Sequence, residues 1–283
     1  MCHPGCQLPS PPPPPQHTHT SRSRLTPPRR YPGLPPLNLT TPDQYSQLLA
    51  TLFPLLNEYR AFTDASIPAR LRLWATEWGT WSGSAAARFT WLQGLWHAAF
   101  SAQLPTALPR LDVLLPYCAV CGDAQMPSFT TSQFGPVVPP NTTVAPGDWR
   151  RTASGHAYAL LFSVLGAPAA TAVQALSFAP NAQLDPATPS SRQLVGLRAV
   201  GAGGADVALA LVNLGAAAAA LDISAAFGGA GCANVWSPAN VTDAARAGIR
   251  VEELDHVSVS VAAGSGALTL APYAIGVITP GAC

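Results

Sequence analysis

The chain has 283 residues, a formal net charge of +1, and charged side chains at only 10% of its positions. A charge so sparse and balanced offers no electrostatic attraction for nucleic acid or for an anionic membrane, so we expect neither partner. Every apolar segment is interrupted by Pro, Gly or a charged residue before it could span a bilayer. The length leaves room for one large domain or two medium domains.

The first 30 residues have the composition of a disordered, proline-rich tail. Ser10 precedes the run Pro11 to Pro15, which favours polyproline II, and the residues that follow have little to bury. Cys2, His3 and Cys6 have the spacing of half a metal site, but no matching second half lies nearby. The sequence therefore predicts a tail over residues 1–30, and neither a metal nor another cofactor.

Cysteines and glycosylation sequons favour a secreted protein. The chain has six cysteines, and Asn-X-Thr sequons begin at Asn38, Asn141 and Asn240. Both features are typical of chains that pass through an oxidising compartment. The N-terminus lacks the apolar core of a signal peptide. We expect the intact parent protein to be extracellular or in a cell wall, its export signal preceding this chain, unless the sequons are unused.

Residues 41–62 are predicted to form a helix. Thr41 has the side chain of an N-cap, and Pro42 stands at the first helical position, where its missing N–H costs nothing. Apolar residues then recur at helical spacing up to Phe62, with a kink expected at Pro54. A short linker that contains Pro68 follows.

The next segments alternate between strand and helix. The apolar run 71–77 has the length of a buried strand, and 84–102 carries apolar residues on one helical face. Residues 111–118 are predicted as a second buried strand, 119–147 as a long loop, and 151–165 as a further helix. This order is typical of a parallel α/β array.

Beyond Pro168 the pattern changes to short alternating runs separated by Gly, Pro, Asn and Asp. This spacing predicts an antiparallel β-sandwich over residues 169–283, with the domain boundary at 166–171. The predicted strands are Ala172–Phe178, Gln193–Val200, Val207–Asn213, Ala219–Ile223, Cys232–Trp236, Ile249–Glu252, Val257–Val261, Leu268–Leu270 and Ala274–Ile278.

Glu77 is the strongest candidate for a catalytic group. It stands at the end of the strand predicted over 71–77, and carboxyl ends of strands hold the active sites of barrels built from alternating strands and helices. A retaining sugar hydrolase needs a nucleophilic carboxylate there and a second carboxyl group about 5 Å away. Trp78, Trp81 and Tyr117 are candidates for a platform on which a sugar stacks. The alternatives are a buried Glu77 paired with an arginine or a backbone N–H, and aromatic side chains that belong to the core.

Five segments carry a resemblance to a known group of enzymes, and their order supports it. Thr76-Glu77-Trp78-Gly79 resembles the seventh-strand nucleophile motif of retaining (β/α)8-barrel (TIM-barrel) glycoside hydrolases. Residues 89–96 are similar to the helix that follows in the α-L-arabinofuranosidase-like and heparanase/β-glucuronidase-like families. Residues 111–118 and 152–161 resemble their eighth strand and helix, and 268–278 the closing strands of their accessory sandwich.

This resemblance implies a partial barrel over residues 31–168 with Glu77 as nucleophile, followed by an accessory β-sandwich. It also exposes a gap. The families' acid/base is a glutamate after asparagine on the fourth strand, whereas the sole Asn-Glu here, Asn57-Glu58, falls inside the helix predicted over 41–62. A full barrel takes roughly 200 residues or more, which exceeds 31–168. We therefore expect a fragment, or a chain that needs a missing N-terminal barrel portion.

The implied activity is that of a glycosidase, although this chain lacks an identifiable acid/base and is expected to be inactive alone. The implied partners are plant, algal or proteoglycan-type polysaccharides and oligosaccharides, with arabinofuranosides or glucuronides first. A noncatalytic carbohydrate-binding wall or matrix protein is the alternative, and a degenerate fragment without function the plainest possibility.

The remaining motifs predict no second active site. Cys118 and Cys121 favour a local disulfide or two free thiols, and pairing of Cys232 with Cys283 stays open. His97 and His156 are expected to be packed or surface histidines. Residues 201–204 are glycine-rich but join two predicted strands, so they indicate a hairpin rather than a phosphate-binding loop.

Overall fold

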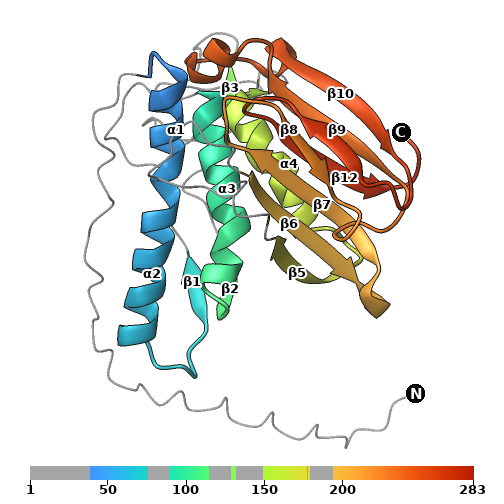
Figure 1. The fold of residues 1–283 in the computed structure, drawn as a ribbon. Coiled ribbons are helices and arrows are strands. Elements are labelled where there is room, and N and C mark those ends of the chain that lie inside the picture. The colour runs from blue at the N-terminus through green and yellow to red at the C-terminus, as the bar shows by residue number, and fades with distance from the viewer. Residues whose placement is uncertain (1–38, 76–89, 115–128, 132–148, 177, 179–193) are drawn as a thin grey trace, which may run out of the picture.

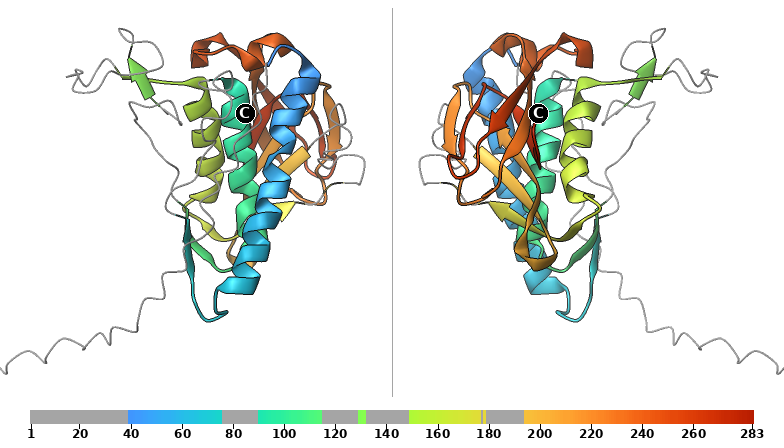
Figure 2. Two further views of the ribbon diagram at one scale, coloured as in Figure 1. Left: turned by 90° about the vertical axis from the view of Figure 1, so that its left-hand side faces the viewer. Right: turned by 90° about the vertical axis from the view of Figure 1, so that its right-hand side faces the viewer.

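The computed structural model describes residues 39–75, 90–114, 129–131, 149–176, 178 and 194–283. In these parts of the chain, four helices lie beside a twisted antiparallel sheet (Figure 1). The views from either side show the helices as one layer against the sheet (Figure 2). None of the described helices combines the length and apolar character that crossing a membrane requires.

The segment predicted as one kinked helix is two helices, α1 (Pro42–Ala50) and α2 (Leu52–Ser66). The predicted start is confirmed: the Thr41 side chain accepts a hydrogen bond from the Gln44 N–H in a capping box. The predicted kink at Pro54 is wrong, because the break falls at Thr51, whose Oγ1 donates to the Leu48 carbonyl at 2.6 Å. Pro54 lies in the first turn of α2, where a missing N–H is tolerated.

The predicted strand–helix–strand unit is present. Strand β1 (Leu73–Ala75) pairs in parallel with β2 (Leu111–Leu114), and α3 (Trp91–Ala107) connects them. Thr90 caps α3 by accepting from the Gln93 N–H at 3.1 Å. The helix runs beyond the predicted end at 102. Ala75 and Leu114 are register partners, so the two strands end at the same edge.

The predicted loop over 119–147 contains a strand. Strand β3 (Phe129–Thr131) pairs with β4 (Trp149–Arg151), which occupies the predicted start of the last helix. That helix, α4 (Ala153–Leu165), begins after Thr152, whose side chain accepts from the Gly155 N–H at 3.0 Å. The cap residue thus decides where the strand ends and the helix begins.

The C-terminal part contains a six-stranded sheet in the order β10-β9-β12-β7-β6-β5, in which all neighbouring strands are antiparallel. A separate pair, β8 with β11, is also antiparallel. The strands are β5 (Ala170–Leu176), β6 (Leu194–Gly201), β7 (Asp206–Asn213), β8 (Ala219–Asp222), β9 (Gly231–Pro238), β10 (Leu254–Val261), β11 (Ala267–Leu270) and β12 (Ile275–Pro280).

One predicted strand is wrong. The segment Ile249–Glu252 leads into a short 3-10 helix, η6 (Val251–Glu253), before β10 begins at Leu254. The Glu253 carboxylate accepts from the backbone N–H of Arg250 at 2.8 Å and pairs with the Arg246 and Arg250 side chains. A carboxylate that satisfies the N–H groups at its own helix start favours a turn over a strand.

Side chains on opposite faces of the six-stranded sheet belong to two cores. In β7, Ala208, Ala210 and Val212 face the cluster formed with the helices, whereas Leu209 and Leu211 face β8 and β11. This alternation is the period of two expected of a strand covered on both sides. The first cluster takes residues from both sides of the predicted boundary at 166–171. The helices and the sheet therefore share one core, and the division into domains stays a prediction.

Helices α3 and α4 pack at very short range. A Cβ atom on Gly94 would lie 2.6 Å from the Ser154 Cα, closer than real contacts allow. Helix α3 is buried on all sides, including its polar residues Gln93, His97 and Ser101. The sequence predicted only one buried face, because the second is covered by α4 and by strands that follow much later in the chain.

Candidate active site

The four predicted site residues, Glu77, Trp78, Trp81 and Tyr117, lie outside the described residues. The structure does place the strand ends that precede them. Glu77 follows the last residue of β1 by two positions, and Tyr117 follows the last residue of β2 by three. Since Ala75 and Leu114 are partners in a parallel pair, these segments leave the sheet at the same edge.

Helix α3, which connects the two strands, packs against α4. Gly94 of α3 meets Ser154 of α4 near the start of both helices, and Ser101 lies near Tyr158 one to two turns later. The two helices thus run in the same direction, and β1 and β2 run against α3, as in βαβ units. In such units the carboxyl ends of the strands and the N-termini of the helices share one end of the molecule, where ligands bind.

Asn57-Glu58, the sole Asn-Glu of the chain, is on α2, as the sequence predicted. Its glutamate is exposed on the helix surface and lies two turns before the helix ends. Glu58 therefore serves as a natural control for Glu77 in the experiments below.

A buried polar cluster lies between α3 and α4. The Ser101 Oγ donates to the His97 carbonyl at 2.8 Å, and the Tyr158 side chain lies nearby. Burial lowers the pKa of His97 to about 3 and raises that of Tyr158 well above its ordinary value. Both side chains are thus held neutral within a helix interface, as the sequence predicted for a packed His97.

Three aromatic side chains link α4 to the sheet edge. The His156 ring stands edge-on to Trp236 of β9 with centroids 4.4 Å apart, and Trp236 stacks on His256 of β10 at 4.1 Å. Asn234 Oδ1 accepts from the Ser258 hydroxyl at 2.8 Å and lies 3.2 Å from His256 Nε2. Sequence reasoning missed this group, although the alternation of Asn234 and Trp236 with apolar neighbours placed both on one strand face.

Burial lowers the pKa of His156 to about 4, and the nearby positive charges of Arg151 and His256 act in the same direction. His97 and His156 therefore stay neutral in the folded protein at a pH where the unfolded chain, with an ordinary histidine pKa near 6.5, binds protons. Their contribution to stability is complete above about pH 6.5 and is lost as the pH falls toward the folded-state values.

We expect the free energy of unfolding to fall by about 1.4 kcal/mol per pH unit for each neutral histidine between roughly pH 6 and 5. Urea unfolding at pH 7, 6 and 5 measures this slope. His156→Gln should reduce the slope, because it removes one of the two neutral histidines. Equal slopes in wild type and His156→Gln would contradict the burial argument.

The other motifs behave as packing or turns. Ser154 and His156 lie on α4, with Ser154 Oγ 3.3 Å from the Thr152 hydroxyl, so they form no catalytic triad. The glycine-rich segment 201–204 joins the antiparallel strands β6 and β7, as predicted. Within the described part of the chain, no group of three His, Cys, Asp or Glu is placed to hold a metal ion.

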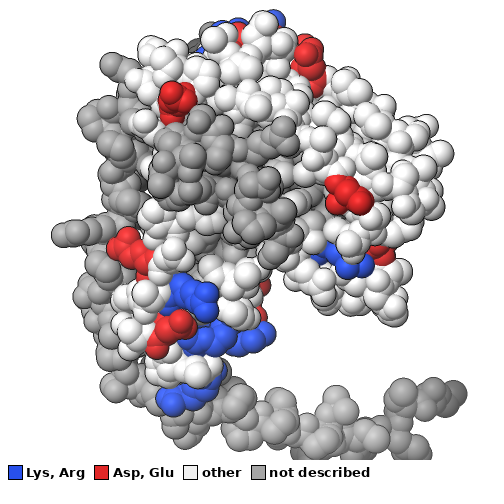
Figure 3. Space-filling model, in the orientation of Figure 1, with Lys and Arg blue, Asp and Glu red and all other residues white. Residues whose placement is uncertain are grey.

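The cysteine pair left open by the sequence is bonded. Cys232 in β9 and Cys283 form a disulfide with a Cα–Cα distance of 4.7 Å. Cys2, Cys6, Cys118 and Cys121 lie outside the described residues. On the face shown in Figure 3, charged side chains gather near β1 and β2, where Arg72 pairs with Asp112 and Arg110 donates to the carbonyls of Pro68 and Leu71.

No protein-family model matches the sequence, and no curated protein matches it. Solved structures do match. A 4-O-α-L-rhamnosyl-β-D-glucuronidase from Fusarium oxysporum 12S aligns over 86% of this chain and 50% of its own, with 12% identity and a TM-score of 0.51. A family 51 α-L-arabinofuranosidase from Bifidobacterium longum aligns over 84% of this chain and 50% of its own, with 13% identity and a TM-score of 0.55.

At such low identity the likeness shows the fold alone. The arrangement of helices and antiparallel strands matches that of glycoside hydrolases, as the resemblance of the sequence motifs implied. The chain spans about half the length of these structures.

Proposed function

We propose that this chain is the nucleophile-bearing half of a retaining glycoside hydrolase, with Glu77 as the nucleophile. Residues 31–168 would be the last units of a (β/α) barrel, and 169–283 an accessory β-sandwich. The observation that carries the proposal is the parallel pair β1 and β2, joined through α3. Glu77 follows the last residue of β1 by two positions in the sequence, and barrel enzymes hold their catalytic carboxylates at the carboxyl ends of such strands.

We propose further that another barrel portion completes the site. Parallel strands are almost always covered on both faces, yet Trp74 in β1 is 68% exposed and Leu71 just before it is 47% exposed. The missing portion would cover these side chains and supply the acid/base. Without it, a sugar with a poor leaving group gains no proton at its departing oxygen, so the chain alone hydrolyses natural substrates little or not at all.

The proposed substrates are arabinofuranosides or glucuronides of plant, algal or proteoglycan-type polysaccharides. The motif resemblance supports both sugars. The ionised Glu77 would attack the anomeric carbon and form a glycosyl ester, while Trp78, Trp81 and Tyr117 stack against the sugar rings. The disulfide between Cys232 and Cys283 supports the proposed extracellular or cell-wall location.

The proposal is tested with a probe that does not need the acid/base. A glycosyl fluoride with a second fluorine beside the anomeric carbon loses fluoride without protonation, and its ester with the nucleophile turns over slowly. We expect arabinofuranosyl or glucuronyl probes to label the full chain on the peptide that contains Glu77. Peptide mass spectrometry locates the adduct.

Matched glutamine variants make the test specific. Glu77→Gln should abolish labelling, whereas Glu58→Gln, in the exposed Asn-Glu pair of α2, should label like wild type. Labelling that persists in Glu77→Gln, or its absence with both sugars, contradicts Glu77 as nucleophile. Retention on insoluble polysaccharide that survives Glu77→Ala would then favour the noncatalytic carbohydrate-binding protein.

A further inference from the structure

The sequon Asn240-Val241-Thr242 lies on an exposed turn, and this feature is independent of the site around Glu77. Asn240 precedes the short 3-10 helix η5 (Val241–Ala245) and has extended backbone angles, φ −130° and ψ 148°. Asn240 and Thr242, the two residues that a glycosylating enzyme reads, are both exposed.

The turn at Asn240 is held by buried contacts on one side and is exposed to solvent on the other. Ala244 is fully buried, and η5 packs against α1, α3 and β9. The Asp243 N–H donates to the Asn240 carbonyl at 3.0 Å and closes the turn. The chain therefore presents the Asn240 amide on a defined support rather than on a loose terminus.

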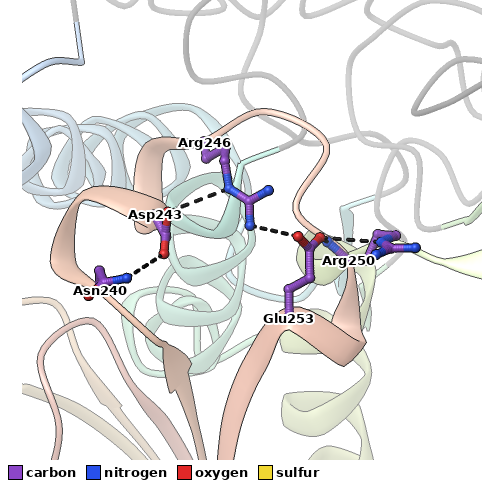
Figure 4. A network of polar contacts seen from close by, with 5 residues as sticks. All are labelled: Asn240, Asp243, Arg246, Arg250 and Glu253. Atoms are coloured by element: carbon purple, nitrogen blue, oxygen red, sulfur yellow. Dashed lines mark hydrogen bonds and ion pairs between the residues drawn. The ribbon is translucent and has the colours of Figure 1, made fainter.

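The neighbouring charges tolerate a modified amide. Asn240 is the outermost member of a polar network that runs through Asp243 and Arg246 to Glu253 and Arg250 (Figure 4). Its Nδ2 donates one hydrogen bond, to Asp243 Oδ2 at 3.1 Å. An amide nitrogen bound to a sugar keeps one hydrogen, so this bond can persist after modification.

A buried asparagine shows the contrast. The Asn213 side chain is fully buried, and its Nδ2 donates to the carbonyls of Ala217 and Ala271 at 2.9 and 2.8 Å. Replacing either hydrogen of that buried amide would break one of these two hydrogen bonds. The exposed Asn240 amide donates a single hydrogen bond, to Asp243, so one of its hydrogens can be replaced without breaking that bond.

The Cys232–Cys283 disulfide indicates that the chain passes through an oxidising compartment. Cys232 is in β9, and Asn240 follows the end of that strand at Pro238. Disulfides form and persist in the oxidising secretory compartments, which are also where sequons are modified. An exposed sequon and an oxidised cysteine pair thus point to the same compartment.

We propose that Asn240 is an N-glycosylation site. The donor is an oligosaccharide linked to a lipid through a diphosphate. The Asn240 Nδ2 forms a bond to the anomeric carbon, the bond from that carbon to the phosphate oxygen breaks, the lipid diphosphate leaves, and Nδ2 gives up one proton to a base of the transferase. The glycan projects from η5 into solvent.

The test is expression of the full chain behind a heterologous secretion signal in a eukaryotic host. Secreted and cell-retained pools are both digested with a glycan-removing amidase in heavy-oxygen water, which converts a modified asparagine into labelled aspartate. We expect labelled aspartate at position 240 in most molecules. The same peptide maps report separately on Asn38 and Asn141, which lie outside the described residues.

Sequence variants guard against misassignment. Asn240→Gln and Thr242→Ala should both abolish the label at this position, whereas Thr242→Ser should retain it, because a serine sequon is still read. An unmodified Asn240 in molecules that contain the Cys232–Cys283 disulfide would overturn the proposal. This outcome says nothing about Glu77, whose labelling by the fluorosugars is measured on separate material.

Discussion

Replacing Trp91 with alanine is expected to lower the free energy of unfolding by about 3 to 5 kcal/mol, the range for removal of a fully buried aromatic side chain. Trp91 begins α3 and has no exposed surface. Its Nε1 donates to the Tyr273 carbonyl at 2.6 Å, which joins the helix layer to the turn before β12. Urea unfolding of wild type and variant measures the difference.

Tyr273 explains why this junction matters. Its side chain is fully buried although its φ of 49° lies in the left-handed region, which is unfavourable for a bulky residue. The Tyr273 N–H donates to the Gly215 carbonyl at 3.1 Å, and its hydroxyl donates to the Pro42 carbonyl at 3.2 Å. The bond from Trp91 is therefore one of several that hold a strained residue at the meeting point of α1, α3 and the sheet.

Two further variants separate the causes. Trp91→Phe keeps most of the buried ring but leaves the Tyr273 carbonyl without its donor, so we expect a loss of about 1 to 3 kcal/mol. Trp74→Ala makes a tryptophan-to-alanine change at a side chain that is 68% exposed, and should stay within about 0.5 kcal/mol of wild type. A Trp91→Ala protein as stable as Trp74→Ala would show that the junction does not stabilise the fold.

Signals confined to a few neighbouring residues were enough to predict most of the elements. Thr41 and Pro42 mark the start of α1 because a cap acts on its own first turn. Eight of the nine strands predicted for the C-terminal part from alternation and turn residues are present. The break falls at Thr51 rather than at Pro54 because the Thr51 hydroxyl bonds the Leu48 carbonyl, whereas a proline in a first turn costs little.

Features that depend on distant partners were not predictable. The burial of α3 beyond its predicted face is created by α4 and by β5 to β7, which lie far along the chain. The short strands β3 and β4 have three residues each, too few for a periodic pattern. The 3-10 helix η6 is capped locally by Glu253, and the ion pair of Glu253 with Arg246, seven residues earlier, adds a contact that no periodic pattern indicates.

The candidate site also has a part that local sequence predicts and a part that depends on distant segments. The motif at Glu77 predicted a strand end beside a second parallel strand end, and β1 and β2 confirm that pairing. The stacking platform of Trp78, Trp81 and Tyr117 and the acid/base partner of Glu77 stay predictions, since they depend on segments that fold against one another. A strand and the residue at its end can be predicted from neighbouring residues. A catalytic pair requires two carboxyl groups to lie close together, and that depends on how the whole barrel folds.

Breaking the Cys232–Cys283 disulfide is expected to lower the free energy of unfolding by about 4 kcal/mol, the loop-closure value for cysteines 51 residues apart. The bridge connects the start of β9 to the residues after β12, and these strands already pair through Thr279 with Cys232 and Pro280 with Gly231. The bridge therefore acts chiefly by lowering the conformational entropy of the unfolded chain, in which it closes a loop between residues 51 positions apart. Urea unfolding with and without a reductant measures the effect.

The variant Cys232→Ser/Cys283→Ser shows whether the measured loss belongs to this bridge. It should match reduced wild type in stability, and any response to the reductant that remains reports on Cys2, Cys6, Cys118 and Cys121 rather than on this bridge. Loss of the bridge should also raise the dependence of the unfolding free energy on urea, since the untethered chain exposes more surface when it unfolds. A difference below about 1 kcal/mol would mean that the ladder between β9 and β12 holds the C-terminus without the covalent link.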